Sequence, residues 1–205
     1  MSVRRSAMHM PRVTIHLPAW VESFLATAPS KFKSIKDRMR LVLDLSGQNV
    51  QNGTGGPFAA AVFEHDGRLV TVGVNLVVAM NCSVFHAEIV ALVLAQRIMG
   101  RYDLSDGGRL HYELFATTEP CAMCFGALPW SGVQRLVCGA RDEDARAIGF
   151  DEGPKMIDWV TALNDRGIDV VRDVLRPDAV QVLRDYAATG GTIYNAGRPK
   201  GASSG

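Results

Sequence analysis

The chain has 205 residues and a mass of 22.2 kDa, a length that suits one domain with its own hydrophobic core. Hydrophobic residues make up 47% and charged residues 21%, which excludes a wholly disordered chain. The net charge is only +1, so nucleic acid is not the expected partner. No apolar stretch is long enough to cross a membrane, and no apolar region follows Arg4 and Arg5 as it would in a secretory signal. We therefore expect a cytoplasmic protein with no membrane partner, whose cysteines stay reduced.

The first half of the chain predicts two helices on either side of a pair of strands. Residues 31–51 place apolar side chains at three- and four-residue steps, the spacing of an amphipathic helix. Residues 58–64 and 68–75 are β-type runs, and His65-Asp66-Gly67 between them is typical of a hairpin turn. Residues 84–99 are apolar nearly all round, which predicts a buried helix.

The second half alternates between the two kinds of element. Strands are predicted at residues 110–117, 134–140 and 168–174, and helices at 121–130, 142–147, 155–165 and 177–189. The order of elements predicts an α/β fold: a three-layer α/β/α sandwich with a mixed central sheet of about five strands. We expect residues 1–30 to form an N-terminal extension, 31–195 the domain, and 196–205, which are rich in Gly and Ser, a flexible tail.

Two short motifs lie where predicted helices begin after strands. His86 and Glu88 mark one helix start, and Cys121 and Cys124 mark another, directly after Pro120. One imidazole and two thiolates supply three zinc ligands and leave the fourth tetrahedral position open for water, as in catalytic zinc sites. Because two thiolates offset the charge of the ion, the water needs a nearby base, and Glu88 is the candidate. The two motifs are expected at one edge of the sheet.

Each motif alone has a simpler interpretation. His86 and Glu88 could belong to a helix cap or to the core, and a C-x-x-C pair also occurs in redox proteins and in structural four-cysteine zinc sites. The combination favours a catalytic zinc, because a redox pair leaves His86 and Glu88 unexplained. Of the remaining cysteines, Cys138 lies in an apolar run and is expected to be buried, whereas Cys82 could lie near the pocket. A fourth protein ligand would close the zinc site.

The pattern H-x-E followed by P-C-x-x-C resembles the signature of the cytidine-deaminase-like superfamily of zinc deaminases. The resemblance covers residues 55–154, with a weaker match through the last helix, and implies one zinc ion per subunit with a bound water or hydroxide. Gly56-Pro57-Phe58, Asn75 and the segment 149–154, Gly-Phe-Asp-Glu-Gly-Pro, are similar to bacterial guanine deaminases, in particular to a branch that acts on guanine and the triazine ammeline. The implied reaction is hydrolysis of guanine to xanthine and ammonia.

The resemblance to guanine deaminases also implies roles for individual residues. Glu152 is expected to be a second catalytic carboxylate that passes protons to the leaving amino group, and Asn75 to hydrogen-bond the base. The residues expected to line or close the pocket are Phe58, Trp130, Asp151 and Tyr194. Without the resemblance, Asn75 could be a turn residue, Phe58 a core residue, Asp151 a cap of its loop, and Trp130 a side chain packed between its helix and the sheet.

Three other functions stay open on the sequence alone. A nucleoside deaminase for guanosine or cytidine would need room for ribose beside the base. A tRNA adenosine deaminase has a similar zinc motif, but the near-zero net charge opposes it. A catalytically silent zinc scaffold that only binds a base would have no use for Glu88. The resemblance further implies a homodimer, with C-terminal segments that are exchanged in some members of the family.

Overall fold

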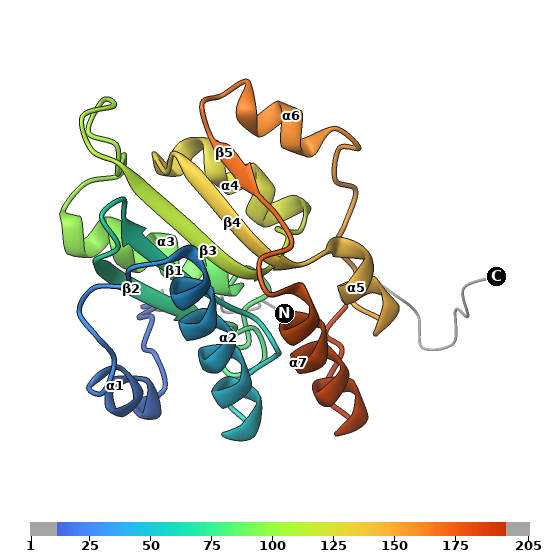
Figure 1. Cartoon of the computed structure of the whole chain (residues 1–205). Helices are drawn as coiled ribbons and strands as arrows, with labels where there is room; N and C mark the ends of the chain where they lie inside the picture. Colours follow the sequence, from blue (N-terminus) through green and yellow to red (C-terminus); the bar gives the residue numbers. More distant parts are fainter. Residues whose placement is uncertain (1–11, 196–205) are drawn as a thin grey trace, which may run out of the picture.

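The centre of the computed structural model, which describes residues 12–195, is a mixed five-stranded sheet in the order β2-β1-β3-β4-β5 (Figure 1). The strands are β1 (Ala59–Glu64), β2 (Leu69–Val74), β3 (Tyr112–Thr118), β4 (Arg135–Ala140) and β5 (Asp169–Val171). Strand β1 is antiparallel to both β2 and β3, whereas β3, β4 and β5 are parallel. The sheet confirms the prediction of about five strands in a mixed arrangement.

Helices cover both faces of this sheet, which confirms the three-layer sandwich. On one face lie α2 (Ile35–Gln51) and α7 (Arg176–Ala188), and on the other lie α3 (Ala87–Met99), α4 (Ala122–Ser131) and α6 (Trp159–Asn164). The short helices α1 (Ala19–Leu25) and α5 (Asp142–Ala147) lie outside these layers.

Successive residues of the central strands point to opposite faces and so supply two cores. From β1, Ala59, Ala61 and Phe63 pack with α2 and α7, whereas Ala60 and Val62 pack with α3, α4 and α6. All five side chains are at most 1% exposed. Burial of both faces explains why the strands read as continuous apolar runs rather than as an alternating pattern.

Several helix boundaries differ from the sequence predictions. Helix α1 was not predicted. It has only seven residues, which is too few for a stable isolated helix. Its Trp20 side chain packs against the core and donates a hydrogen bond of 3.0 Å to Thr54.

Helix α2 begins at Ile35 rather than at residue 31, because Ser34 and Asp37 form a capping box there. Helix α3 begins at Ala87 rather than at residue 84, because His86 has an extended backbone. The predicted tail, 196–205, lies outside the described residues.

A buried carboxylate, Glu113, lies at the amino end of β3, opposite to the end that continues into the cysteine motif. Its side chain pairs with the buried Arg38 and also with Arg135, whose Nη1 donates to Oε1 over 3.0 Å. His65 Nδ1 lies 3.2 Å from the same oxygen. A buried ion pair contributes little net stability, but loss of one partner leaves an unpaired buried charge.

We therefore expect Glu113→Ala to lower the free energy of unfolding by about 3–5 kcal/mol in urea titrations, because Arg38 stays buried without its anion. The control is Lys31→Ala, which removes an exposed pair with Asp66 and is expected to change stability by less than about 1 kcal/mol. Equal effects of the two substitutions would contradict this account of Glu113.

Candidate active site

The edge of the sheet where β2, β3 and β4 end brings the two sequence motifs together. Because β1 is antiparallel to both β2 and β3, these two strands run in the same direction and end at the same edge. The chain leaves β2 at Asn75 and reaches α3 through His86, and it leaves β3 at Thr118 and reaches α4 through Cys121. The amino ends of α3 and α4 therefore meet at this edge, as the sequence predicted.

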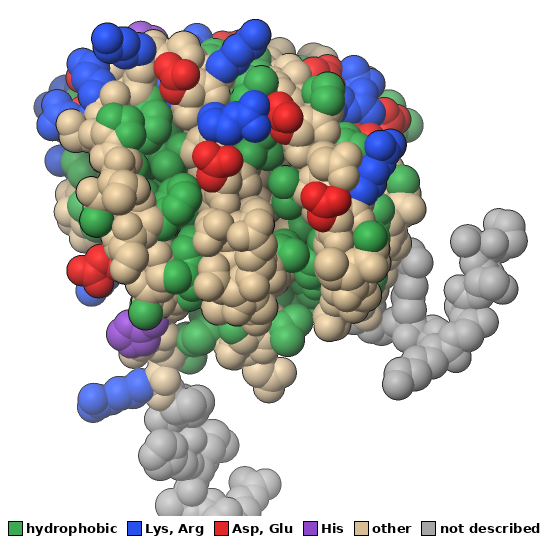
Figure 2. All heavy atoms as spheres, turned by 60° about the horizontal axis from the view of Figure 1, so that its bottom comes forward, with side chains coloured by type: hydrophobic (Ala, Val, Ile, Leu, Met, Phe, Trp, Pro, Cys, Tyr) green, Lys and Arg blue, Asp and Glu red, His purple; other side chains and the backbone are tan. Residues whose placement is uncertain are grey.

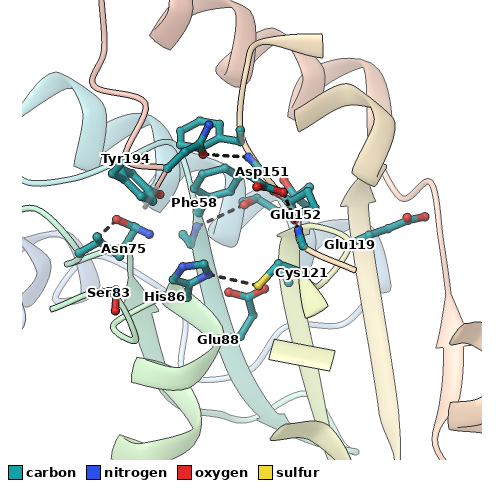
Figure 3. Close-up of a pocket in the computed structure, with 18 residues that line it drawn as sticks. Phe58, Asn75, Ser83, His86, Glu88, Glu119, Cys121, Asp151, Glu152 and Tyr194 are labelled. Atoms are coloured by element: carbon teal, nitrogen blue, oxygen red, sulfur yellow. Dashed lines mark hydrogen bonds between the residues drawn. The ribbon is translucent and has the colours of Figure 1, made fainter. Parts of the chain in front are cut away.

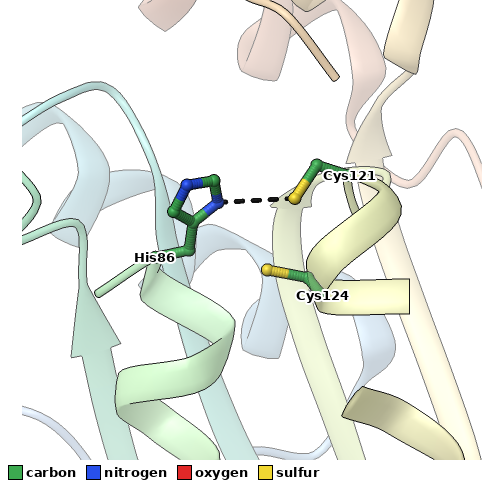
Figure 4. A group of neighbouring side chains, drawn as sticks. All are labelled: His86, Cys121 and Cys124. Atoms are coloured by element: carbon green, nitrogen blue, oxygen red, sulfur yellow. Dashed lines mark hydrogen bonds between the residues drawn. The ribbon is translucent and has the colours of Figure 1, made fainter. Parts of the chain in front are cut away.

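The side chains of His86, Cys121 and Cys124 form one cluster (Figure 4). One ligand atom from each residue lies within 4.8 Å of the other two, and Cys121 Sγ is 3.4 Å from His86 Nδ1. His86 and Cys121 are the residues that precede α3 and α4, and neither side chain caps its own helix, so both are free to point at a shared ion. Two sulfurs and one imidazole nitrogen are a donor set that zinc prefers over magnesium or calcium, and three such ligands fit a catalytic zinc site.

The two thiols of the cluster differ in acidity. Hydrogen bonds from Cys124 and from His86 lower the pKa of Cys121 to about 4, although burial opposes this. The bond shared with Cys121, together with burial, raises the pKa of Cys124 well above its usual value. Cys121 is therefore a thiolate at neutral pH, and binding of an ion would release the proton of Cys124.

Two buried carboxylates approach this cluster from different elements (Figure 3). Glu88, in the first turn of α3, is 8% exposed, and burial followed by the charge of Cys121 raises its pKa. Glu152 lies in the loop between α5 and α6 and is 7% exposed. Burial, and then the charges of Cys121, Asp142 and Glu88, raise the pKa of Glu152 to about 8, so this carboxyl holds a proton at neutral pH.

A cavity of about 240 Å³ opens in front of the cluster. This volume is below the roughly 300–1,000 Å³ of pockets for drug-sized ligands, which suits a small ring system. Of the residues singled out in the sequence, those that line the cavity are Phe58, Asn75, His86, Glu88, Cys121, Asp151, Glu152 and Tyr194. The cavity thus brings together nearly all of the site residues that were predicted from the sequence.

Three aromatic rings and two polar atoms without hydrogen-bond partners line part of the cavity. The centroid of the Phe150 ring lies 4.9 Å from the centroid of the Phe58 ring and 5.0 Å from that of the Tyr194 ring. Within residues 12–195, neither the buried Asn75 Nδ2 nor the buried Tyr194 hydroxyl has a hydrogen-bond partner, and both residues line the cavity. Since buried polar groups are normally paired, these two atoms are candidates to bind a polar ligand.

The position of Asn75 is fixed by its neighbours. Asn49 Nδ2 donates to the Asn75 carbonyl oxygen over 3.1 Å, and the Asn75 side-chain oxygen accepts from the Val77 N–H over 3.3 Å. A Cβ at position 55 would lie 1.9 Å from the Asn75 carbonyl oxygen, so the close approach here requires Gly55. The amide group of Asn75 is therefore held in place before any ligand binds.

The expectation that Trp130 lines the pocket is wrong. Trp130 is 79% exposed and is not among the residues that line the cavity. It stands nine residues after Cys121, which displaces it by roughly 13 Å along α4 from the end that carries the ligands. Trp130 therefore lies on the surface of the protein and not in the cavity.

The remaining cysteines lie outside the described metal cluster. Cys138 in β4 is completely buried, as expected, and burial raises its pKa well above the usual value. Cys82 is half-buried and is not one of the three clustered ligands. The structure therefore leaves the cluster with three protein ligands among residues 12–195.

Sequence reasoning missed Asn195, which also lines the cavity. Its side-chain oxygen accepts from the Asp151 N–H over 2.9 Å, and its amide nitrogen donates to the Gly149 carbonyl over 2.8 Å. Asp151 in turn accepts from the Gly153 N–H over 3.0 Å, so it orients the loop as well as lining the cavity. No local pattern predicts these contacts, because they join segments that are more than 40 residues apart.

No helix within residues 12–195 has the length and hydropathy that a membrane span requires.

Comparison with known proteins places the chain among zinc deaminases. The family model for the cytidine and deoxycytidylate deaminase zinc-binding region matches residues 33–140. A solved structure of a guanine deaminase from Nitrosomonas europaea is 45% identical, with a TM-score of 0.82 over 88% of this chain and 100% of that chain.

Two curated relatives match at lower identity. The guanine deaminase of Bacillus subtilis (strain 168) is 33% identical over 114 residues, which are 56% of this chain and 69% of that protein. The tRNA-specific adenosine deaminase of Buchnera aphidicola subsp. Schizaphis graminum is 28% identical over 148 residues, 72% of this chain and 90% of that protein. The family match covers more than half of the chain and includes all three clustered ligands. The chain belongs to the family of cytidine and deoxycytidylate deaminase zinc-binding proteins.

Proposed function

We propose that this chain is a zinc-dependent hydrolytic deaminase that converts guanine and water to xanthine and ammonia. The observation that carries the proposal is the pair of buried carboxylates, Glu88 and Glu152, which line one small cavity beside the three-ligand cluster. The similarity to guanine deaminases of two bacteria supports guanine as the substrate. Ammeline, a flat triazine with a ring amino group, is included in the proposal as a second substrate.

The proposed mechanism assigns a separate proton to each carboxylate. His86, Cys121 and Cys124 would hold the zinc ion, which would supply a water molecule of lowered pKa. Glu88 would accept a proton from the water as its oxygen attacks the amino-bearing carbon of guanine, and would then donate this proton to a ring nitrogen. Glu152 would donate a proton to the amino group as the C–N bond breaks. The hydroxyl group that the water leaves on the carbon would lose its proton as it becomes the carbonyl, and this proton would restore Glu152, so that the products are xanthine and ammonia.

The other polar and aromatic residues would hold the base. Asn75 Nδ2 is a buried donor that can bond to an oxygen or nitrogen of the ring. Phe58 and Phe150 supply apolar faces against which a flat purine can pack. Tyr194 lines the cavity of its own chain, where it limits the space for a ribose and so disfavours guanosine and cytidine.

The same family contains tRNA-specific adenosine deaminases, which makes tRNA the main alternative substrate. The net charge of +1 opposes this alternative, because tRNA binding relies on many phosphate contacts. On the face in Figure 2, basic and acidic side chains are interspersed rather than gathered in one basic patch. A silent zinc scaffold is disfavoured because burial of Glu88 and Glu152 is unfavourable unless these residues have a role.

The proposal also includes the oligomeric state and the location of the protein: a homodimer in a reducing compartment such as the cytoplasm. Trp130, Met156 and Ile157 are 79%, 57% and 96% exposed, and in the proposed dimer these large apolar side chains are candidates for the buried surface. Exchange between subunits of the C-terminal segment that carries Tyr194 stays a prediction. A reducing compartment is expected because zinc binding needs Cys121 and Cys124 as thiolates rather than as a disulfide.

The activity can be tested by ammonia release from guanine, guanosine, ammeline, adenine, cytosine and cytidine. We expect guanine to be the best substrate and Glu88→Gln to lower its kcat by at least about 100-fold, because the variant has no base for the water. Zinc content, measured by atomic emission, should stay at one ion per chain. Preference for cytidine, or full activity in Glu88→Gln, would contradict the proposal.

Glu152→Gln is expected to lower kcat for guanine by roughly 100-fold with little change in KM, because an amide cannot supply the proton. Asn75→Ala is expected to raise KM instead, since it removes a bond to the bound base. The matched control is Asp165→Asn on the exposed end of α6, which should change neither constant. Unchanged kcat in Glu152→Gln would remove the proposed proton donor and leave the zinc site intact.

The three-ligand cluster predicts how the four cysteines react with an aromatic disulfide reagent. With zinc bound, only the half-buried Cys82 should react rapidly, because the metal protects Cys121 and Cys124. A chelator should raise the count to two, since Cys121 lines the cavity, and denaturation to four, since Cys124 and Cys138 are at most 1% exposed. Two reactive cysteines before chelation would show that one of the proposed ligands does not bind the ion.

A further inference from the structure

The loop that carries Glu152 is attached to the start of α4 by two hydrogen bonds. The Ala122 N–H donates to the Glu152 carbonyl oxygen over 2.9 Å, and Lys155 Nζ donates to the Pro120 carbonyl oxygen over 2.9 Å. Pro120 and Ala122 are the two neighbours of Cys121 in the chain. The two bonds therefore join the segment 152–155 to the residues on either side of a proposed zinc ligand.

Lys155 is a buried cation whose position is closely defined. Its side chain is 7% exposed, and its ammonium group lies 3.2 Å from Asp142 Oδ1 and 3.9 Å from Glu119 Oε2. The ammonium also lies 4.8 Å from the centroid of the Trp159 ring. An ammonium group this deeply buried is unfavourable unless it is paired on all sides, so these contacts keep it in one place.

We infer that Lys155 is a positioning residue for the proposed deamination: it holds the Glu152 loop against α4 and thereby sets the place of the Glu152 carboxyl relative to Cys121. This inference rests on the proposed function. Lys155 is not among the residues that line the cavity, so it acts through Glu152 rather than on the substrate. The loop also passes close to α4 at Gly153, where a Cβ would lie 3.1 Å from the Ala122 side chain.

The zinc ligands themselves do not depend on Lys155. Glu119, which precedes Pro120, is also held by Arg172 Nε over 2.6 Å and by the Asp142 N–H over 3.2 Å. The end of β3 and the start of α4 thus stay anchored when Lys155 is removed. Loss of Lys155 should free the Glu152 loop and leave the metal in place.

The test compares Lys155→Met, which keeps most of the side-chain volume, with Lys31→Met. Lys31 is an exposed lysine between α1 and α2 that pairs with Asp66 of the turn between β1 and β2. We expect Lys155→Met to lower kcat for guanine by about 10–100-fold, because small displacements of a catalytic group have effects of this size. KM and zinc content should stay close to those of the wild type, and Lys31→Met should change none of the three. In a Glu152→Gln background, Lys155→Met should change kcat by less than about 2-fold, since its effect passes through Glu152.

A second variant covers the case in which Lys155→Met does not fold. Ala122→Pro removes the other hydrogen bond at the first residue of α4, a position where proline is well tolerated, and Cys121 before it already has a compatible backbone. It should also lower kcat without loss of zinc. Loss of zinc in proportion to kcat in either variant would overturn the inference, because the substitution would then act on the metal site.

A readout independent of catalysis separates this inference from the proposed function. In the zinc-loaded protein, Lys155→Met should speed hydrogen–deuterium exchange in residues 149–155 and leave exchange in β3 unchanged. If the wild type shows no release of ammonia from guanine, the proposed function fails, and the exchange result still decides the attachment of the loop. Unchanged exchange in the loop, or effects of Lys155→Met and Glu152→Gln that simply add, would overturn the role of Lys155.

Discussion

A zinc ion held by His86, Cys121 and Cys124 requires one nitrogen and two sulfurs within a few ångströms of one another, although His86 and Cys121 are 35 residues apart in the chain. The sheet meets this requirement, because β2 and β3 run in the same direction on either side of β1 and end at the same edge. Each ligand then needs only to stand where a helix begins. The two layers of helices and the buried strands can be understood as the support that keeps these two helix starts together.

This geometry gathers groups that repel one another. Glu88, Glu152 and Cys121 lie around one cavity, and burial followed by the negative charge of Cys121 raises the pKa of both carboxyl groups. A bound cation would relieve part of this repulsion. Lys155 and Arg172 do not line the cavity, and their cationic groups pair with Glu119 rather than with Glu88 or Glu152.

The parts that could be predicted from sequence are those defined by local spacing. The positions of His86, Glu88, Cys121 and Cys124 relative to helix starts were enough to indicate the metal cluster, and the continuous apolar runs were enough to indicate the sheet. Trp130 was placed wrongly because its closeness to the cysteines in the chain does not reveal its distance along α4.

The remaining contacts depend on tertiary structure. Lys155 and Asn195 bond to backbone atoms of distant segments, and such contacts leave no repeating pattern in the sequence. Helix α1 was missed for a related reason, since its stability comes from packing on the core rather than from its seven residues.

X-ray absorption at the zinc edge of the protein in solution tests the central claim most directly, namely that His86, Cys121 and Cys124 bind one zinc and leave one position for water. The account predicts two sulfur neighbours at about 2.3 Å and two nitrogen or oxygen neighbours at about 2.0 Å, one of which comes from solvent. A shell with three or four sulfurs would contradict it, because a further cysteine would then close the position that the reaction needs.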